Sequence, residues 1–174
     1  ELMPIMEHPY DGSWGYQISG YYAPTSRFGT PHDFMYMIDR FHQKNIGVIL
    51  DWVPGHFCPD DFALREFDGT ATYEPEHYSL SQNEHWGTIN FDLGRNEVKN
   101  FLISSALYWM DYYHIDGIRV DAVAYIIHNR IDGEVGNPNS DNVDWNGVNF
   151  LKELNETITS FYPDVIMVAE DSSP

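Results

Sequence analysis

Three apolar segments of the sequence each run into a carboxylate. Residues 46–50 precede Asp51, residues 117–120 precede Asp121, and residues 165–169 precede Glu170. Arg119 lies inside the second segment, and alternate residues of a strand point to the same side. Because an unpaired buried charge costs several kcal/mol, we expect Arg119 and Asp121 to share one pocket.

Two carboxylates that face one pocket can cleave a glycosidic bond, one as nucleophile and the other as proton donor. Arg119 is expected to hold Asp121 ionised and oriented, as a nucleophile requires. Glu170 follows apolar residues and has no basic neighbour in the sequence, which favours a proton donor. From the spacing alone, a structural ion cluster explains the same residues equally well.

Strand-like and helix-like segments alternate along the chain. Thr30-Pro31 is typical of a helix start, so residues 31–44 are predicted to be helical. Asn96-Glu97 and Asn146 are predicted to cap two further helices, and the second ends before Pro163. Apolar runs before and between these helices predict strands, and no hairpin signals are found. This βαβαβαβ pattern predicts a parallel sheet.

The positions of the carboxylates select among parallel-sheet folds. Carboxylates at the carboxyl ends of successive parallel strands are how (β/α)8 barrels build their active sites. The glycine-rich phosphate-binding pattern of doubly wound sheets is missing. Residues 52 to about 95 lack clear periodicity, and such long stretches are uncommon unless functional. We therefore predict an α/β fold, part of a (β/α)8 barrel.

Composition limits the possible partners. The 174 residues are 43% hydrophobic and 16% aromatic, which is typical of a globular protein. Nine basic against 27 acidic residues, a net charge of −18, disfavour nucleic acid and anionic membranes as partners. With no membrane span and no signal-peptide pattern, a cytoplasmic location is expected. Cys58 is the only cysteine, and we interpret it as an inert loop thiol.

Neither a metal nor a cofactor is predicted. Residues 142–153 nearly match a calcium-binding EF-hand loop, but Asn142 stands at the first ligand position and Asn149 at the hydrophobic one. The scattered histidines lack the paired spacing of zinc ligands; they are His77, His85 and His114. Aromatic loop side chains suit the apolar faces of sugars, although packing is the preferred interpretation for Trp14 and Trp52.

The motifs together resemble a known family. They are "SWGYQ", "YYAPTSRFGTP", "VILDWVPGHF", "FDGT", "DGIRVDAVA" and "VIMVAEDS", and they extend over essentially the whole chain. The chain resembles the α-amylase superfamily (glycoside hydrolase family 13) and, within it, the 1,4-α-glucan branching enzymes. The resemblance implies a (β/α)8 barrel.

The resemblance also implies roles for particular residues. Asp121 matches the family's catalytic nucleophile, Glu170 its general acid/base, and Arg119 the arginine that supports the nucleophile. The matching substrate-binding residues, which contact the sugar on the non-reducing side of the scissile bond, are Tyr16, Asp51 and His56.

The implied reaction is retaining glycosyl transfer on α-1,4-glucans such as amylose and glycogen. An α-1,4 bond is cleaved and an α-1,6 branch forms, as in glycogen biosynthesis. A hydrolase of the same superfamily, similar to maltooligosyl trehalose trehalohydrolases, is the alternative enzyme. A glucan-binding module without catalysis is the alternative from another class, but it predicts loss of carboxylates that are present here.

The sequence departs from the family pattern in two ways. Gly55 stands where many amylases have an asparagine that helps hold a structural calcium, which weakens the expectation of a metal. The family's third catalytic aspartate has no match before the chain ends. The resemblance thus makes residues 1–174 an internal segment of the catalytic barrel, about strands two to five, with no complete domain boundary. Without the remainder of its barrel, the segment is expected to be inactive.

Overall fold

The computed structural model of the chain describes residues 1–128, 130–131, 134–135 and 142–171. The helices are α1 (Pro31–His42), α2 (Tyr78–Ser81), α3 (Asn96–Tyr113), α4 (Val123–Ile127) and α5 (Trp145–Phe161). The strands are β1 (Met6–Glu7), β2 (Gly20–Pro24), β3 (Ile49–Trp52), β4 (His56–Phe57), β5 (Gln82–Asn83), β6 (Thr88–Asn90), β7 (Gly117–Val120), β8 (Arg130–Ile131), β9 (Glu134–Val135) and β10 (Ile166–Ala169).

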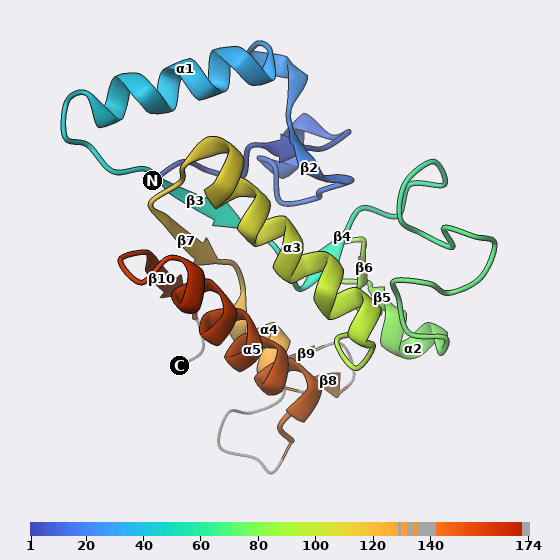
Figure 1. Cartoon of the computed structure of the whole chain (residues 1–174). Helices are drawn as coiled ribbons and strands as arrows, with labels where there is room; N and C mark the ends of the chain where they lie inside the picture. The colour runs from blue at the N-terminus through green and yellow to red at the C-terminus, as the bar shows by residue number, and fades with distance from the viewer. Residues whose placement is uncertain (129, 132–133, 136–141, 172–174) are drawn as a thin grey trace.

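A parallel sheet lies at the centre of the fold. Its strand order is β10–β7–β3, and Leu2 adds a parallel bridge to Leu50 at the β3 edge (Figure 1). The central strand β7 is apolar except for Arg119 and mostly buried, as parallel strands covered on both faces are. The three apolar runs that end near carboxylates thus form neighbouring strands, and the predicted parallel sheet is confirmed.

Helices α3 and α5 pack against each other in front of this sheet (Figure 1). The inward face of α3 carries Val98, Leu102 and Trp109, which are each at most 1% exposed. On α5, Phe150 is fully buried, whereas Phe161 near the end of the helix is 68% exposed. Among the described residues, no helix is both long and apolar enough to span a membrane.

The helix starts follow local side-chain chemistry, with two shifts from the prediction. Thr30 caps α1 as predicted and forms a capping box with Asp33. Helix α3 begins at Asn96, so its N-cap is Arg95, which makes no capping side-chain bond. The α5 cap is Asp144, whose carboxylate accepts the N–H groups of Asn146 and Gly147. A carboxylate two positions earlier therefore takes the role predicted for Asn146.

The sequence showed no hairpin signals, but the structure contains antiparallel strand pairs, so this prediction is wrong. Strand β1 pairs antiparallel with β2, β6 pairs antiparallel with both β4 and β5, and β8 pairs with β9. Most of these strands are two or three residues long, too short for an alternating pattern to be seen in the sequence. Strands β4, β5 and β6 belong to the long connection between β3 and α3. This connection lies beside the parallel sheet in Figure 1.

Candidate active site

The parallel sheet brings the predicted carboxylates to one end. Asp51 pairs in register with Arg119 across β3 and β7, and Arg119 pairs on its other side with Val168 of β10. Asp121 and Glu170 come directly after β7 and β10. Because parallel strands end at the same edge of a sheet, residues far apart in sequence meet there. Active sites of α/β barrels and open sheets occupy this edge.

Arg119 joins the three carboxylates. Its Nη1 atom lies 2.8 Å from Asp51 Oδ1, 2.9 Å from Asp51 Oδ2 and 2.9 Å from Asp121 Oδ1. Its Nη2 atom is 3.7 Å from Glu170 Oε2. The Asp51 side chain is only 2% exposed, and those of Asp121 and Arg119 are 13% and 17% exposed. One cation thus stands among one buried and two partly buried anions, which confirms the predicted pairing of Arg119 with Asp121.

The electrostatic balance differs from the sequence-based expectation for Asp121. Burial raises the pKa of Asp121 to about 6, and the charges of Asp51 and Glu170 add to this rise. Arg119 lowers the same pKa, as expected, but by less than the other causes raise it. Burial also raises the pKa of Asp51, against the lowering effect of Tyr16 and Arg119. Asp121 is therefore mostly ionised at neutral pH and becomes protonated in mild acid.

Tyr16 belongs to the same cluster. Its hydroxyl donates a hydrogen bond of 2.7 Å to Asp51 Oδ2, the oxygen that also faces Arg119. Burial raises the pKa of the Tyr16 hydroxyl, and the Asp51 carboxylate raises it further, so this group stays a proton donor. The loop before β2 thereby reaches the end of β3, a contact that the sequence alone could not show.

Replacement of Tyr16 by phenylalanine is expected to lower kcat/KM of the full-length protein by about tenfold. A hydrogen bond to a charged group contributes about 1.5–3 kcal/mol, and Asp51 loses one of the donors that orient it. The aromatic ring is kept, so the change isolates the hydroxyl. Initial rates of the catalysed reaction measure the effect. An unchanged kcat/KM would mean that Arg119 alone orients Asp51.

His56 lies in β4 and is 4% exposed. Its ring packs on Trp86, with centroids 4.9 Å apart, and Trp86 packs in turn on Tyr125 at 4.3 Å. The Gln17 side chain donates a hydrogen bond of 2.9 Å to the Trp86 carbonyl. Trp86 was not among the predicted site residues. The only indication in the sequence was that Trp86 lies in the stretch from residue 52 to about 95, which lacks clear periodicity.

The predictions for Trp14, Trp52 and Cys58 have different outcomes. Trp52 is fully buried, which confirms packing, whereas Trp14 is 72% exposed and does not pack as predicted. Cys58 is 6% exposed, and burial raises the pKa of its thiol to about 12. Such a thiol carries almost no thiolate at neutral pH, which supports the interpretation of Cys58 as inert.

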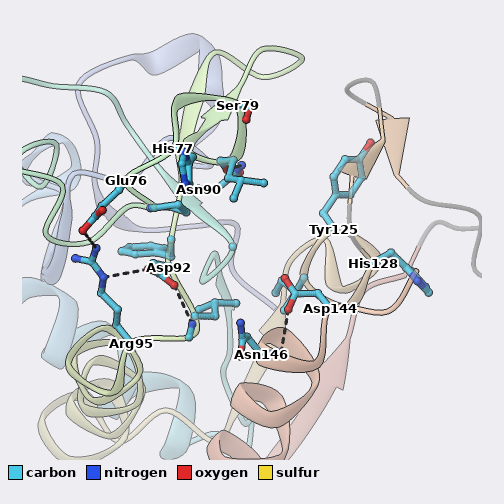
Figure 2. Close-up of a pocket in the computed structure, with 17 residues that line it drawn as sticks. Glu76, His77, Ser79, Asn90, Asp92, Arg95, Tyr125, His128, Asp144 and Asn146 are labelled. Atoms are coloured by element: carbon cyan, nitrogen blue, oxygen red, sulfur yellow. Dashed lines mark hydrogen bonds and ion pairs between the residues drawn. The ribbon is translucent and has the colours of Figure 1, made fainter. Parts of the chain in front are cut away.

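A cavity of about 650 Å³ opens elsewhere, between the segment before α3 and the start of α5 (Figure 2). Arg95 at its wall pairs with Asp92 at 3.0 Å and Glu76 at 3.6 Å, while Asp144 caps α5. These charges are satisfied by one another and by helix ends. The described lining residues include none of the three strand-end carboxylates, but they include Tyr125, which packs on Trp86.

Two of the described residues weigh against a calcium ion. Gly55 has no side-chain oxygen, and Asp144 uses its carboxylate on the backbone of α5. Within the described ranges, no group of three or more His, Cys, Asp or Glu side chains is arranged to hold a metal ion.

Comparison with known proteins places this geometry in a family. The family model for the alpha-amylase catalytic domain matches residues 2–79 and 65–174. The chain belongs to the alpha-amylase family. A crystal structure of α-amylase from Geobacillus thermoleovorans in complex with acarbose superposes with a TM-score of 0.72 over 98% of this chain and 36% of that one, at 23% identity. The fold is thus an α/β fragment of the TIM-barrel type.

Other members of the alpha-amylase family are more similar in sequence. The 1,4-alpha-glucan branching enzyme GlgB of Halothermothrix orenii is 55% identical over 177 residues, 99% of this chain and 28% of that enzyme. GlgB of Bacillus cytotoxicus is 57% identical over 173 residues, 99% of this chain and 26% of that enzyme. The chain therefore spans about a quarter of the length of these relatives.

Proposed function

We propose that the protein containing this chain is a 1,4-α-glucan branching enzyme. The observation that carries the proposal is the 55–57% identity to branching enzymes over 99% of the chain. The cluster of Asp121, Glu170 and Arg119 supplies the groups that retaining glycosyl transfer requires. The proposed substrates are α-1,4-glucans such as amylose and glycogen.

In the first half of the proposed reaction, Asp121 attacks the anomeric carbon of an α-1,4-glucan. Glu170 gives its proton to the glycosidic oxygen, which leaves with the electron pair of the broken bond. A covalent glycosyl ester on Asp121 results. Arg119 offsets the negative charge of Asp121 before the attack, which is needed because burial otherwise disfavours that charge.

In the second half, the Glu170 carboxylate takes a proton from the 6-hydroxyl of an acceptor chain. The acceptor oxygen bonds to the anomeric carbon and displaces Asp121, which forms an α-1,6 branch with retained configuration. Tyr16, Asp51 and His56 are proposed to bind the sugar on the non-reducing side of the scissile bond.

Three further statements stay predictions. They are the inactivity of the isolated segment, its assignment to strands two to five of the barrel, and a cytoplasmic location.

The deciding experiment compares two products of the full-length protein on amylose. NMR of α-1,6 anomeric protons counts branches, and a reducing-end assay counts hydrolytic events. Growing α-1,6 signal with few new reducing ends is the expected result. New reducing ends without α-1,6 signal would instead establish a hydrolase, with water as the acceptor. Glucan binding with neither product would establish a non-catalytic binding module.

A further inference from the structure

The backbone immediately after Asp121 has an unusual conformation. Ala122 has φ 50° and ψ 46°, in the left-handed region that residues with a Cβ atom seldom adopt. Such conformations persist only where the surrounding structure enforces them, and they cluster at functional sites. Ala122 lies between the proposed nucleophile and the start of α4 at Val123, so the strained residue lies beside the reacting groups.

This turn is bonded to Glu170 on the neighbouring strand. The Ala122 N–H donates a hydrogen bond of 2.7 Å to Glu170 Oε2. The Val123 N–H donates at 2.8 Å to the Glu170 carbonyl, and the Glu170 N–H donates at 2.9 Å to the Val120 carbonyl. Both the backbone and the carboxylate of Glu170 are therefore tied to the segment that carries Asp121.

The two oxygens of Glu170 have different surroundings. Oε2 accepts the Ala122 N–H and lies 3.7 Å from Arg119 Nη2, so a donor and a cation both face it. Among the described residues, none donates to Oε1. A protonated carboxyl places its hydrogen on the oxygen that is not already accepting a hydrogen bond and facing a cation. The same distinction holds for Asp121, where Arg119 contacts Oδ1.

We propose that the left-handed turn at Ala122 is a positioning element that holds Glu170 by Oε2, so that Oε1 carries the proton transferred to and from the sugar oxygens. This inference rests on the proposed glycosyl transfer. When the bond breaks, the proton leaves Oε1 for the glycosidic oxygen, and the new carboxylate charge is stabilised at Oε2 by the Ala122 N–H. The return proton from the acceptor hydroxyl arrives on Oε1.

The test removes the N–H and keeps the side chain. Lactic acid incorporated at position 122 replaces the amide with an ester, so that Glu170 loses its backbone donor. The full-length protein is assayed on the maltooligosaccharide that the wild type uses as donor and on the α-maltooligosyl fluoride of the same length. Fluoride leaves without a proton, so only the first substrate depends on the position of Oε1.

The ester variant is expected to lose at least about tenfold in kcat/KM on the maltooligosaccharide and less than about threefold on the fluoride, because one charge-assisted hydrogen bond is removed. Equal losses on both substrates, or no loss on either, would overturn the proposal. Activity on the fluoride also shows that the variant is folded. The Ala122→Gly variant, which keeps the N–H and adopts the left-handed region readily, is expected to keep the wild-type ratio of the two rates.

A second variant covers the case in which the ester protein does not fold. Ala122→Val keeps the N–H but disfavours the left-handed conformation, so it should give the same selective loss to a smaller extent. A ratio equal to that of the wild type would overturn the proposal. The proposed function is tested separately on the wild type, and it fails if amylose gains no α-1,6 branches.

Discussion

The Asp121→Asn variant of the full-length protein is expected to lose activity by a factor on the order of 10⁴ or more, because it removes the nucleophilic oxygen of a covalent mechanism. The same variant is expected to be more stable than the wild type at neutral pH. Burial raises the pKa of Asp121 to about 6, so the folded state disfavours the charge that the unfolded chain carries freely. Removing that charge should raise the free energy of unfolding by about 3 kcal/mol, because one pKa unit corresponds to about 1.36 kcal/mol.

The sign follows from the direction of the pKa shift. Between the ordinary pKa of an aspartate and a pKa of about 6, the folded wild type binds more protons at Asp121 than the unfolded chain does. The wild type is thus stabilised as the pH falls through this window, and the variant lacks this gain. Thermal unfolding midpoints of both proteins at pH 7 and pH 5 measure the effect.

Asp61→Asn is the matched control for Asp121→Asn. The Asp61 side chain is 93% exposed and only pairs with Arg65 at 3.6 Å, so neither activity nor midpoint should change. A lower midpoint for Asp121→Asn at pH 7 would mean that the pairing with Arg119 outweighs the burial of the charge. Retained activity would remove Asp121 from the role of nucleophile.

The Arg119→Met variant is expected to destabilise the full-length protein by about 3–5 kcal/mol. The change leaves the carboxylate of Asp51, which is 2% exposed, without its cation, and breaking a buried ion pair on one side has this cost. Methionine fills much of the space of the arginine side chain, so lost packing is a small part of the destabilisation. Chemical denaturation followed by tryptophan fluorescence measures the change.

The pH dependence of kcat/KM should also shift in the Arg119→Met variant. In the wild type, kcat/KM is expected to fall as the pH drops below about 6, where Asp121 becomes protonated. Arg119 lowers the pKa of Asp121, so its removal should shift this acid limb to higher pH. Arg119→Lys, which keeps the charge but not the planar group, should restore part of the wild-type profile. An unmoved acid limb in Arg119→Met would contradict the proposed role of Arg119.

Much of the fold and the candidate site followed from the sequence alone. The apolar runs before Asp51, Asp121 and Glu170 predicted parallel strands, and β3, β7 and β10 are those strands. The Thr30 cap of α1 was predicted because the capping groups lie within three residues of one another. The pairing of Arg119 with Asp121 followed from the two-residue period of a strand. Such signals are local, so a single sequence carries them.

The tertiary structure decided the features that depend on distant segments. The contact of Ala122 with Glu170 joins residues 48 positions apart, and that of Arg119 with Asp51 joins residues 68 positions apart. No periodicity encodes contacts at such separations. The packing of Trp86 on His56 was missed for the same reason, whereas most of the antiparallel strands were missed because they are only two or three residues long.

The electrostatic character of Asp121 also had to come from the tertiary structure. From the sequence, only Arg119 was visible beside Asp121, and the expected effect was a fully ionised carboxylate. The folded chain adds burial and the charges of Asp51 and Glu170, which raise the pKa of Asp121 despite the arginine. Residue types and their local spacing therefore determined which groups take part and on which strands they lie. Burial and the summed field of neighbouring charges arise only when the strands assemble, and these decided how strongly Asp51 and Asp121 hold their protons.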